Sequence, residues 1–322
     1  MSGRLGFALV GLGGLSTHQI APAFARTRRC RLTAVVTGRA EEGAAWRARY
    51  GVSAYRYEDL ARLADDPAVD VVYLVTPNAM RRDLALAVAR AGKHVFCEKP
   101  LEVSSARCRE MIDACAAAGV RLGVAYRQRF EPHHLECARL AREQVFGRVR
   151  MIRADFGFAI GQPPLWRLDQ SLSGGGPLID VGIYCLQTAR MITGAEPVSV
   201  TAQAVRPAGG RFGDVEASIV FTLAFPDGVL AHCGASYEMP MNELAVYCER
   251  GAFGLKPAYN YGDNHGWRSD GEPLAFPQID HFAAEMDDFA RCIQTGEPST
   301  VSGEEGLRDV AIIEELYRAA LA

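Results

Sequence analysis

Two places in the chain carry side chains suited to proton transfer. One is Glu98-Lys99-Pro100, which follows an apolar stretch, and the other is the pair Asp180 and Tyr184, four residues apart. A spacing of four places two side chains on the same side of a helix. The tyrosine phenol has a reference pKa of ~10, and a nearby ammonium group stabilises the phenolate, so Lys99 beside Tyr184 would create a general base. We expect Tyr184 to move the proton, Lys99 to hold the substrate oxygen and Asp180 to orient the substrate. The roles of Lys99 and Tyr184 are exchangeable, because burial can also turn a lysine into the base.

A glycine-rich segment, VGLGGLS at residues 10–16, lies between a predicted strand and a predicted helix. Gly11 allows a tight turn, Gly13 lets a ligand approach the backbone, and Ser16 stands where a third glycine or alanine is common. The N-terminus of the following helix offers N–H groups to a pyrophosphate. We therefore predict a dinucleotide-binding loop that consists of Gly11, Leu12, Gly13, Gly14, Leu15 and Ser16.

The segment VVTGRAEEG, residues 35–43, closes the second predicted strand and has no carboxylate before Glu41. An acid at the end of this strand would bind the ribose hydroxyls of NAD and repel a 2′-phosphate. Thr37 offers a hydroxyl, Gly38 leaves space, and Arg39 offers a guanidinium that suits a phosphate. These residues favour NADP, with NAD as the alternative if Arg39 is only a solvated surface residue.

The arrangement of apolar stretches predicts an α/β fold with two domains. Residues 5–125 alternate strands with helices, which indicates a doubly wound parallel sheet of the Rossmann type. After about residue 126, short β-rich stretches joined by Pro and Gly turns indicate a largely antiparallel sheet. We assign dinucleotide binding to residues 1–126, and substrate binding and oligomerisation to an α+β domain at residues 127–322. Two final helices, residues 279–295 and 303–320, are candidates to pack back on the first domain.

Composition excludes several classes of protein. The chain has 322 residues, a formal net charge of −3 and nine cysteines without a C-x-x-C pair. This charge offers no basic field for nucleic acid, no stretch approaches the ~20 apolar residues of a membrane-spanning helix, and the scattered cysteines indicate reduced thiols. The first strand starts by Leu5, which leaves no room for an export signal. We expect a cytoplasmic protein that binds neither nucleic acid nor membranes and, since its histidines lack ligand spacing, no metal.

Three motifs together resemble the glucose-fructose oxidoreductase/inositol dehydrogenase (Gfo/Idh/MocA) family: DDPAVDVVYLVTPN, AGKHVFCEKPL and GGGPLIDVGIY. The segment PLWRLDQSLSGGGPLIDVGIYCLQTARMITGAEPVSV is most similar to the glucose-fructose oxidoreductase branch. The resemblance implies hydride transfer between NAD(P) and a carbohydrate carbon, and an open-faced antiparallel sheet that forms a homodimer or homotetramer. It places Lys99, Asp180 and Tyr184 in the active site. It also implies cofactor contacts by Thr76, Pro77, Asn78, Glu98, Lys99, Trp166 and Arg167.

The sequence departs from the family pattern at two residues. Arg81 stands where a histidine usually follows the Pro-Asn pair, and Glu42 stands where NADP-binding relatives often have a basic residue. Two other functions remain open: a trans-dihydrodiol dehydrogenase, which would have a more apolar substrate cleft, and a regulator that senses NAD(P) without turnover. The Asp180 and Tyr184 pair favours an enzyme, since a sensor has no need of an acid and base.

Overall fold

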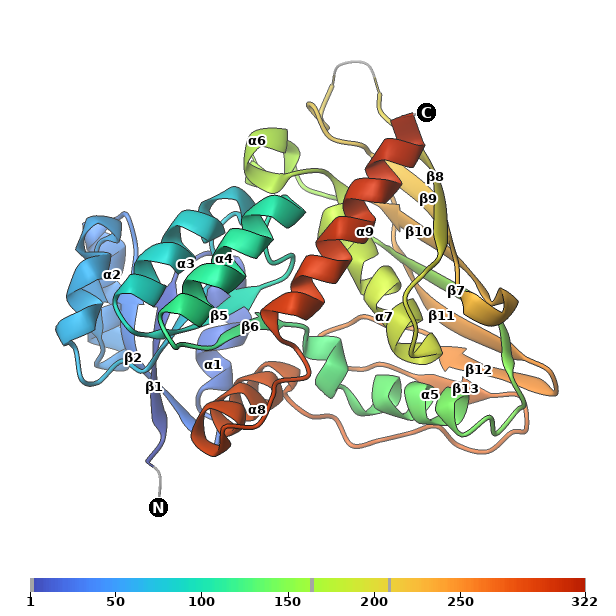
Figure 1. Cartoon of the computed structure of the whole chain (residues 1–322), viewed down its shortest axis with the longest axis horizontal. Coiled ribbons are helices and arrows are strands. Elements are labelled where there is room, and N and C mark those ends of the chain that lie inside the picture. The colour runs from blue at the N-terminus through green and yellow to red at the C-terminus, as the bar shows by residue number, and fades with distance from the viewer. Residues whose placement is uncertain (1–2, 163–164, 208–209, 322) are drawn as a thin grey trace. The chain divides into compact units, whose positions relative to one another are not determined.

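The computed structural model describes residues 3–162, 165–207 and 210–321, and of Leu321 only the backbone. The chain forms two compact units (Figure 1). The first consists of Met1–Arg127 and Asp280–Arg308, and the second of Gln128–Ile279 and Asp309–Ala322.

The described residues of the first unit form a six-stranded parallel sheet with the order β3-β2-β1-β4-β5-β6. Its strands are β1 (Leu5–Val10), β2 (Cys30–Val36), β3 (Ser53–Tyr55), β4 (Val71–Leu74), β5 (His94–Glu98) and β6 (Leu122–Ala125). The chain winds outward from β1 in one direction through β2 and in the other through β4. Ligands of such sheets bind beyond the carboxyl ends of the strands where the direction changes. The predicted doubly wound sheet is confirmed.

Helices connect these strands, and two of them differ from the predicted α-helices. The segment after β1 begins as a π-helix, Ser16–Ile20, and continues as the short α1 (Ala21–Ala23), while the segment after β3 is a 3-10 helix, Tyr57–Asp65. Further helices of the first unit are α2 (Ala40–Tyr50), α3 (Arg81–Arg90), α4 (Ser105–Ala117) and α8 (His281–Thr295). α8 begins after Asp280, whose carboxylate accepts a hydrogen bond from the N–H of Ala283 at 3.0 Å. Such a cap satisfies an N–H group that has no partner within the helix.

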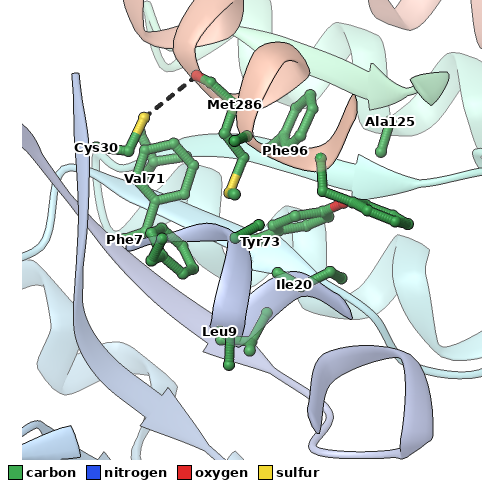
Figure 2. Close-up of a cluster of buried hydrophobic side chains, with 14 of the residues drawn as sticks. Phe7, Leu9, Ile20, Cys30, Val71, Tyr73, Phe96, Ala125 and Met286 are labelled. Carbon is green, nitrogen blue, oxygen red and sulfur yellow. Dashed lines mark hydrogen bonds between the residues drawn. The ribbon is translucent and has the colours of Figure 1, made fainter. Parts of the chain in front are cut away.

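α8 contributes to the hydrophobic core of the first unit (Figure 2). The carbonyl of Met286 accepts a hydrogen bond from Cys30 Sγ at 3.3 Å, and the rings of Phe96 and Phe289 stack with centroids 4.8 Å apart. Gly123 in β6 makes room for this contact, since a Cβ there would lie 2.6 Å from the Phe289 ring. Truncating a buried phenylalanine to alanine typically costs about 3–5 kcal/mol. The C-terminal part of the chain therefore stabilises the strands that carry the predicted cofactor site.

The described residues of the second unit form a seven-stranded sheet with the order β13-β12-β11-β7-β10-β9-β8. Its strands are β7 (Val149–Gly157), β8 (Ser199–Val205), β9 (Ser218–Ala224), β10 (Leu230–Ser236), β11 (Met241–Cys248), β12 (Gly251–Leu255) and β13 (Gly266–Arg268). Neighbours are antiparallel except β7 and β10, which are parallel. The prediction of a largely antiparallel sheet is confirmed.

One face of this sheet packs against helices and the other exposes apolar side chains. α5 (Pro132–Arg142) and α7 (Ile183–Thr193) lie on the packed side. The short α6 (Gln170–Ser173) precedes α7 in the chain. On the opposite side, the strand register aligns Tyr247 of β11, Met151 of β7 and Leu230 of β10, and all three are exposed. Val220 and Val205 extend this set on β9 and β8. We call these five residues the exposed sheet face.

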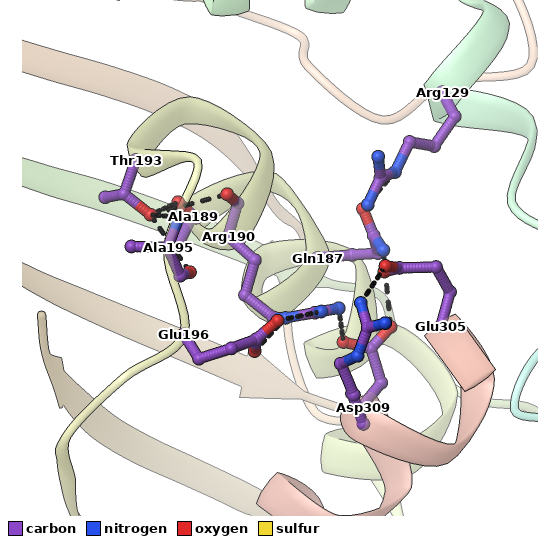
Figure 3. Close-up of polar contacts among 10 residues, drawn as sticks. Arg129, Gln187, Ala189, Arg190, Thr193, Ala195, Glu196, Glu305 and Asp309 are labelled. Carbon is purple, nitrogen blue, oxygen red and sulfur yellow. Dashed lines mark hydrogen bonds and ion pairs between the residues drawn. The ribbon is translucent and has the colours of Figure 1, made fainter. Parts of the chain in front are cut away.

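A buried ion pair anchors α7 within the second unit (Figure 3). Arg190 donates to Asp309 Oδ1 at 2.6 Å and to both oxygens of Glu196, and the side chains of Arg190 and Asp309 are almost fully buried. Asp309 belongs to α9 (Gly303–Leu321). Removing one partner of a buried pair typically costs about 3–5 kcal/mol, because it leaves the other charge uncompensated. Across the described ranges, no helix is long and apolar enough to cross a membrane.

Candidate active site

The glycine-rich segment after β1 forms a loop that a side-chain hydrogen bond closes. Gly11 has a φ of 88°, which residues with a Cβ rarely adopt, and Ser16 Oγ donates to the Gly11 carbonyl at 2.5 Å. Ser16 is fully buried, so its hydroxyl has a structural part in the loop. A Cβ built on Gly13 would meet no atom within 4 Å, which leaves the backbone there open to a ligand. The loop therefore fits the pyrophosphate of a dinucleotide.

The end of β2 lies beside one acidic and one basic side chain, those of Glu42 and Arg39. The Glu42 carboxylate accepts hydrogen bonds from Thr37 Oγ1 and from the Arg39 guanidinium. Hydrogen bonding to Glu42 raises the pKa of Arg39. The first turn of α2 therefore brings a carboxylate to the end of a strand that carries none of its own. Gly38 lies against the ring of Tyr57, where a Cβ would be 3.4 Å from the ring.

Arg81 connects the two loops that follow β4 and β5. Its Nε donates to the Thr76 carbonyl at 3.1 Å, and its Nη1 donates to the carbonyls of Glu98, at 2.8 Å, and of Pro100. Arg81 is 4% exposed and replaces the histidine of the family pattern. Thr76 and Asn78, two of the predicted cofactor residues, are also buried. Arg81 thus has a positioning role here, and only the structure reveals it.

Glu98 belongs to a buried cluster with Tyr73, which lies in the DDPAVDVVYLVTPN motif, and with Glu285, for which the sequence carried no motif. The Tyr73 hydroxyl lies 2.8 Å from Glu98 Oε1 and 3.3 Å from Glu285 Oε1, but it has only one proton to donate. Burial and the neighbouring Glu98 raise the pKa of Glu285 well above its usual value. Burial also raises the pKa of Glu98, while the charges of Lys99 and Arg81 counteract the shift. The hydroxyl of Tyr73 therefore serves one carboxyl group at a time, and Glu98 lies at the shorter distance.

Lys99 directly follows β5, and its peptide bond to Pro100 is cis. The lysine therefore stands at the carboxyl edge of the parallel sheet, where open α/β sheets bind their ligands.

Asp180 and Tyr184 lie in the second unit, on consecutive helical segments. Asp180 belongs to a π-helix, Leu178–Gly182, and Tyr184 to α7. Asp180 Oδ2 accepts hydrogen bonds from Arg167 Nε at 3.1 Å and from the Tyr237 hydroxyl at 2.9 Å. The two donors hold the Asp180 carboxylate in a defined orientation. Tyr237 is a further site residue that sequence reasoning missed, because it directly follows β10, 57 residues along the chain from Asp180.

Aromatic rings surround Tyr184 and accompany Arg167. The Tyr184 ring meets Phe156 edge-on at a centroid distance of 5.5 Å, and Tyr259 lies 6.1 Å from it. The Arg167 guanidinium lies 4.6 Å from the Trp166 ring, a cation–π distance. Trp166, Arg167 and Asp180 therefore form a connected set within the second unit.

The glycine triplet before Asp180 is held by a buried carboxylate. Glu216 accepts hydrogen bonds from the N–H groups of Gly176 and Leu178, both at 3.0 Å, and from the Tyr317 hydroxyl at 2.9 Å. A Cβ on Gly175 would lie 1.9 Å from the Tyr317 hydroxyl, and one on Gly176 would lie 2.4 Å from the Glu216 carbonyl. Close packing thus requires Gly175 and Gly176, and the Glu216 contacts fix the start of the helical segment that carries Asp180.

The predicted site residues fall in both units. The glycine loop, Thr37, Gly38, Arg39, Thr76, Pro77, Asn78, Glu98 and Lys99 belong to the first, and Trp166, Arg167, Asp180 and Tyr184 to the second. The meeting of Lys99 with Asp180 and Tyr184 stays a prediction.

Known proteins match both parts of the chain. Residues 5–126 match the model of an oxidoreductase family with an NAD-binding Rossmann fold, Gfo/Idh/MocA, and residues 134–254 match the Gfo/Idh/MocA C-terminal domain. The chain belongs to the Gfo/Idh/MocA family. The crystal structure of an aldose-aldose oxidoreductase from Caulobacter crescentus, complexed with glycerol, is 41% identical, covers 99% of this chain and 98% of its own, and has a TM-score of 0.95.

Curated Gfo/Idh/MocA relatives also extend over most of the chain. A D-xylose 1-dehydrogenase (NADP(+)) of Haloarcula marismortui is 32% identical over 98% of this chain and 90% of its own length. A trans-1,2-dihydrobenzene-1,2-diol dehydrogenase of Danio rerio is 31% identical over 81% of this chain and 80% of its own. The resemblance stated from the sequence motifs is confirmed.

Proposed function

We propose that this chain is an NADP-dependent oxidoreductase that transfers a hydride between a sugar or polyol carbon and the nicotinamide. The observation that carries the proposal is the Asp180 carboxylate, which Arg167 and Tyr237 hold one helical segment before Tyr184. A fixed carboxylate can orient a polyhydroxylated substrate, and a tyrosine on the next helical segment can exchange a proton with the substrate hydroxyl. The names of the relatives, an aldose-aldose oxidoreductase and a D-xylose dehydrogenase, support the substrate class.

The first domain, residues 1–126, would hold the cofactor. The loop from Gly11 to Ser16 would bind the pyrophosphate, Thr37, Gly38 and Arg39 the adenosine end, and Thr76, Pro77, Asn78, Glu98 and Lys99 the nicotinamide end, with Trp166 and Arg167 completing the set. When bound, the nicotinamide accepts or donates the hydride. The second domain, residues 127–322, would bind the substrate.

In the oxidative direction, Tyr184 receives the proton of the substrate hydroxyl as the hydride leaves the carbon that bears it. Lys99 holds the substrate oxygen and stabilises the tyrosine phenolate. Asp180 binds a second hydroxyl of the substrate and so fixes the reacting carbon. In the reductive direction, Tyr184 returns the proton to the carbonyl oxygen.

The test is the absorbance of the reduced nicotinamide after purified protein is mixed with NADP and a panel of aldoses. Reduction by at least one aldose supports the proposal. Binding of the cofactor without turnover of any sugar or diol would instead point to a regulator that senses NAD(P).

A trans-dihydrodiol dehydrogenase is the second candidate, and the aromatic rings of Phe156 and Tyr259 around Tyr184 favour it. The same assay with an aromatic trans-diol separates the two. An apolar cleft should prefer the diol over aldoses, and a polar cleft the reverse.

We also propose a cytoplasmic homodimer or homotetramer that assembles through the exposed sheet face. The aligned apolar residues Tyr247, Met151 and Leu230 are the kind of patch that monomers rarely expose. Light scattering should show a species larger than the 35.0 kDa chain, and Met151→Asp should shift it toward the monomer. A monomer at micromolar concentration would contradict this assembly.

A further inference from the structure

A single tyrosine hydroxyl lies between two buried carboxyl groups of the first unit. Tyr73 and Glu285 are fully buried, and Glu98 is 4% exposed. The Tyr73 hydroxyl lies 2.8 Å from Glu98 Oε1 and 3.3 Å from Glu285 Oε1. Because the hydroxyl has one proton, the two carboxyl groups compete for it, and the shorter distance favours Glu98.

Ring packing fixes this hydroxyl between the two acids (Figure 2). The Tyr73 ring on β4 packs against Phe96 on β5 with centroids 4.7 Å apart, and Phe96 stacks on Phe289 of α8. Glu285 precedes Phe289 by one turn of α8, so the packing that holds Phe289 also places Glu285. The Tyr73 hydroxyl therefore cannot turn away toward water, since its ring is enclosed in the core.

The surroundings of Glu98 favour its ionised form. Burial raises the pKa of Glu98, because a carboxylate loses its hydration there. Four neighbouring groups counteract this shift, namely Lys99, Arg81, Tyr73 and Arg127. The negative charge on Glu98 thus depends on the Tyr73 hydroxyl as well as on the three cations.

Glu285 has less compensation for a charge. Burial and the neighbouring Glu98 raise the pKa of Glu285 well above its usual value. Arg127 favours its charge, Asp280 opposes it, and His281 lies one turn earlier on α8. Among the residues that the structure describes, Glu285 Oε2 is buried without a hydrogen-bond partner. A negative charge is therefore less stable on Glu285 than on Glu98.

We propose that Tyr73 is a positioning residue of the reaction: its hydroxyl stabilises Glu98 as the carboxylate beside Lys99, and Glu285 is the alternative acceptor that competes for this hydroxyl. The carboxylate attracts the Lys99 ammonium and so limits its movement around the substrate oxygen. The inference rests on the proposed function in that Lys99 holds that oxygen. Tyr73 itself acts only through Glu98.

NMR of the lysines reports the charge of Glu98 without any turnover. The chain has three lysines, Lys93, Lys99 and Lys256, so lysine labelled with carbon-13 at Cε gives three signals. Lys99→Arg identifies the signal of Lys99. Because the charges of Glu98 and Lys99 interact, this signal should show a transition as Glu98 ionises, and the other two lysines serve as references.

Tyr73→Phe removes the hydroxyl and keeps the ring. Glu98 should then bind its proton about tenfold more tightly, because its carboxylate loses a charge-assisted hydrogen bond, and the transition of the Lys99 signal should move to higher pH. Glu285→Gln keeps an acceptor that cannot become charged. In this variant the transition should stay in place or move to lower pH, since no second negative charge opposes that of Glu98.

Tyr55→Phe is the matched control. The Tyr55 hydroxyl also donates to a carboxylate of the first unit, Asp66 Oδ2 at 2.7 Å, so its removal costs a comparable hydrogen bond away from Glu98. Proton binding by Glu98 should change by less than about twofold in this variant. In steady-state kinetics with an aldose, the acid limb of kcat should move to higher pH in Tyr73→Phe, whereas a purely structural loss would lower kcat equally at every pH.

A transition that moves to lower pH in Tyr73→Phe would show that the Tyr73 proton belongs to Glu285, and would overturn the inference. An equal shift in Tyr55→Phe, a shift to higher pH in Glu285→Gln, or a wild-type Lys99 signal without a transition would do the same. So would an acid limb of kcat that stays at its wild-type pH while the NMR transition moves.

Absence of turnover with every sugar and diol would instead contradict the proposed function. The NMR shift in Tyr73→Phe would still show that Tyr73 stabilises the Glu98 carboxylate, so the two failures are distinguishable. Thermal melting of each variant verifies that the fold is intact.

Discussion

Replacing Glu216 by alanine should destabilise the protein and disable the site without touching the cofactor loop. The change removes the acceptor of two buried N–H groups, those of Gly176 and Leu178. Each buried donor left without a partner costs about 1–3 kcal/mol, so the pair costs about 2–6 kcal/mol. Burial raises the pKa of Glu216, which shows that its charge is itself unfavourable there, and its removal offsets part of the loss. We expect a net loss of about 2–4 kcal/mol.

Urea unfolding measures the stability, and steady-state kinetics measures the consequence for the site. Because the glycine triplet leads into the segment of Asp180 and Tyr184, kcat should fall by about tenfold or more while dinucleotide binding is kept. Tyr317→Phe is the graded control: it removes one donor to Glu216 but leaves the carboxylate that accepts from Gly176 and Leu178, and should cost about 1 kcal/mol. A Glu216→Ala protein with wild-type stability and turnover would refute the reasoning.

Four further variants test other parts of the site. Tyr184→Phe and Lys99→Met should each lower kcat by about a hundredfold or more, with cofactor binding kept in the tyrosine variant; near-wild-type turnover of Tyr184→Phe would leave Lys99 as the base. Arg39→Asp should shift the cofactor preference from NADP toward NAD by about tenfold or more, as measured by titration with both cofactors. Glu285→Gln should gain stability over wild type as pH rises above about 4.3, since the carboxyl of Glu285 ionises there in the unfolded state, while its raised pKa disfavours ionisation in the folded state. A stability difference between Glu285→Gln and wild type that is the same at every pH would show that the pKa of Glu285 is not raised in the folded state.

The sequence by itself determined the features that depend on short stretches of chain. Alternating strands and helices predicted the parallel sheet, because crossover connections of that length leave few other topologies. The loop around Gly11 and the Lys99-Pro100 step were recognisable because the residues of each motif are adjacent in the sequence. The motif that contains Asp180 was recognised from the sequence. The four-residue spacing of Asp180 and Tyr184 suggested an α-helix, however, where the structure has a π-helix at Asp180.

Only the tertiary structure decided the contacts between residues far apart in sequence. The pairing of Tyr73 with Glu285 joins positions 212 residues apart, and Tyr237 reaches Asp180 across 57 residues. Glu42 was visible as a charge, but whether its carboxylate returns to the end of β2 depends on how α2 packs there. Such contacts have no periodicity or motif, because their partners are chosen by the packing of whole elements and not by local propensity.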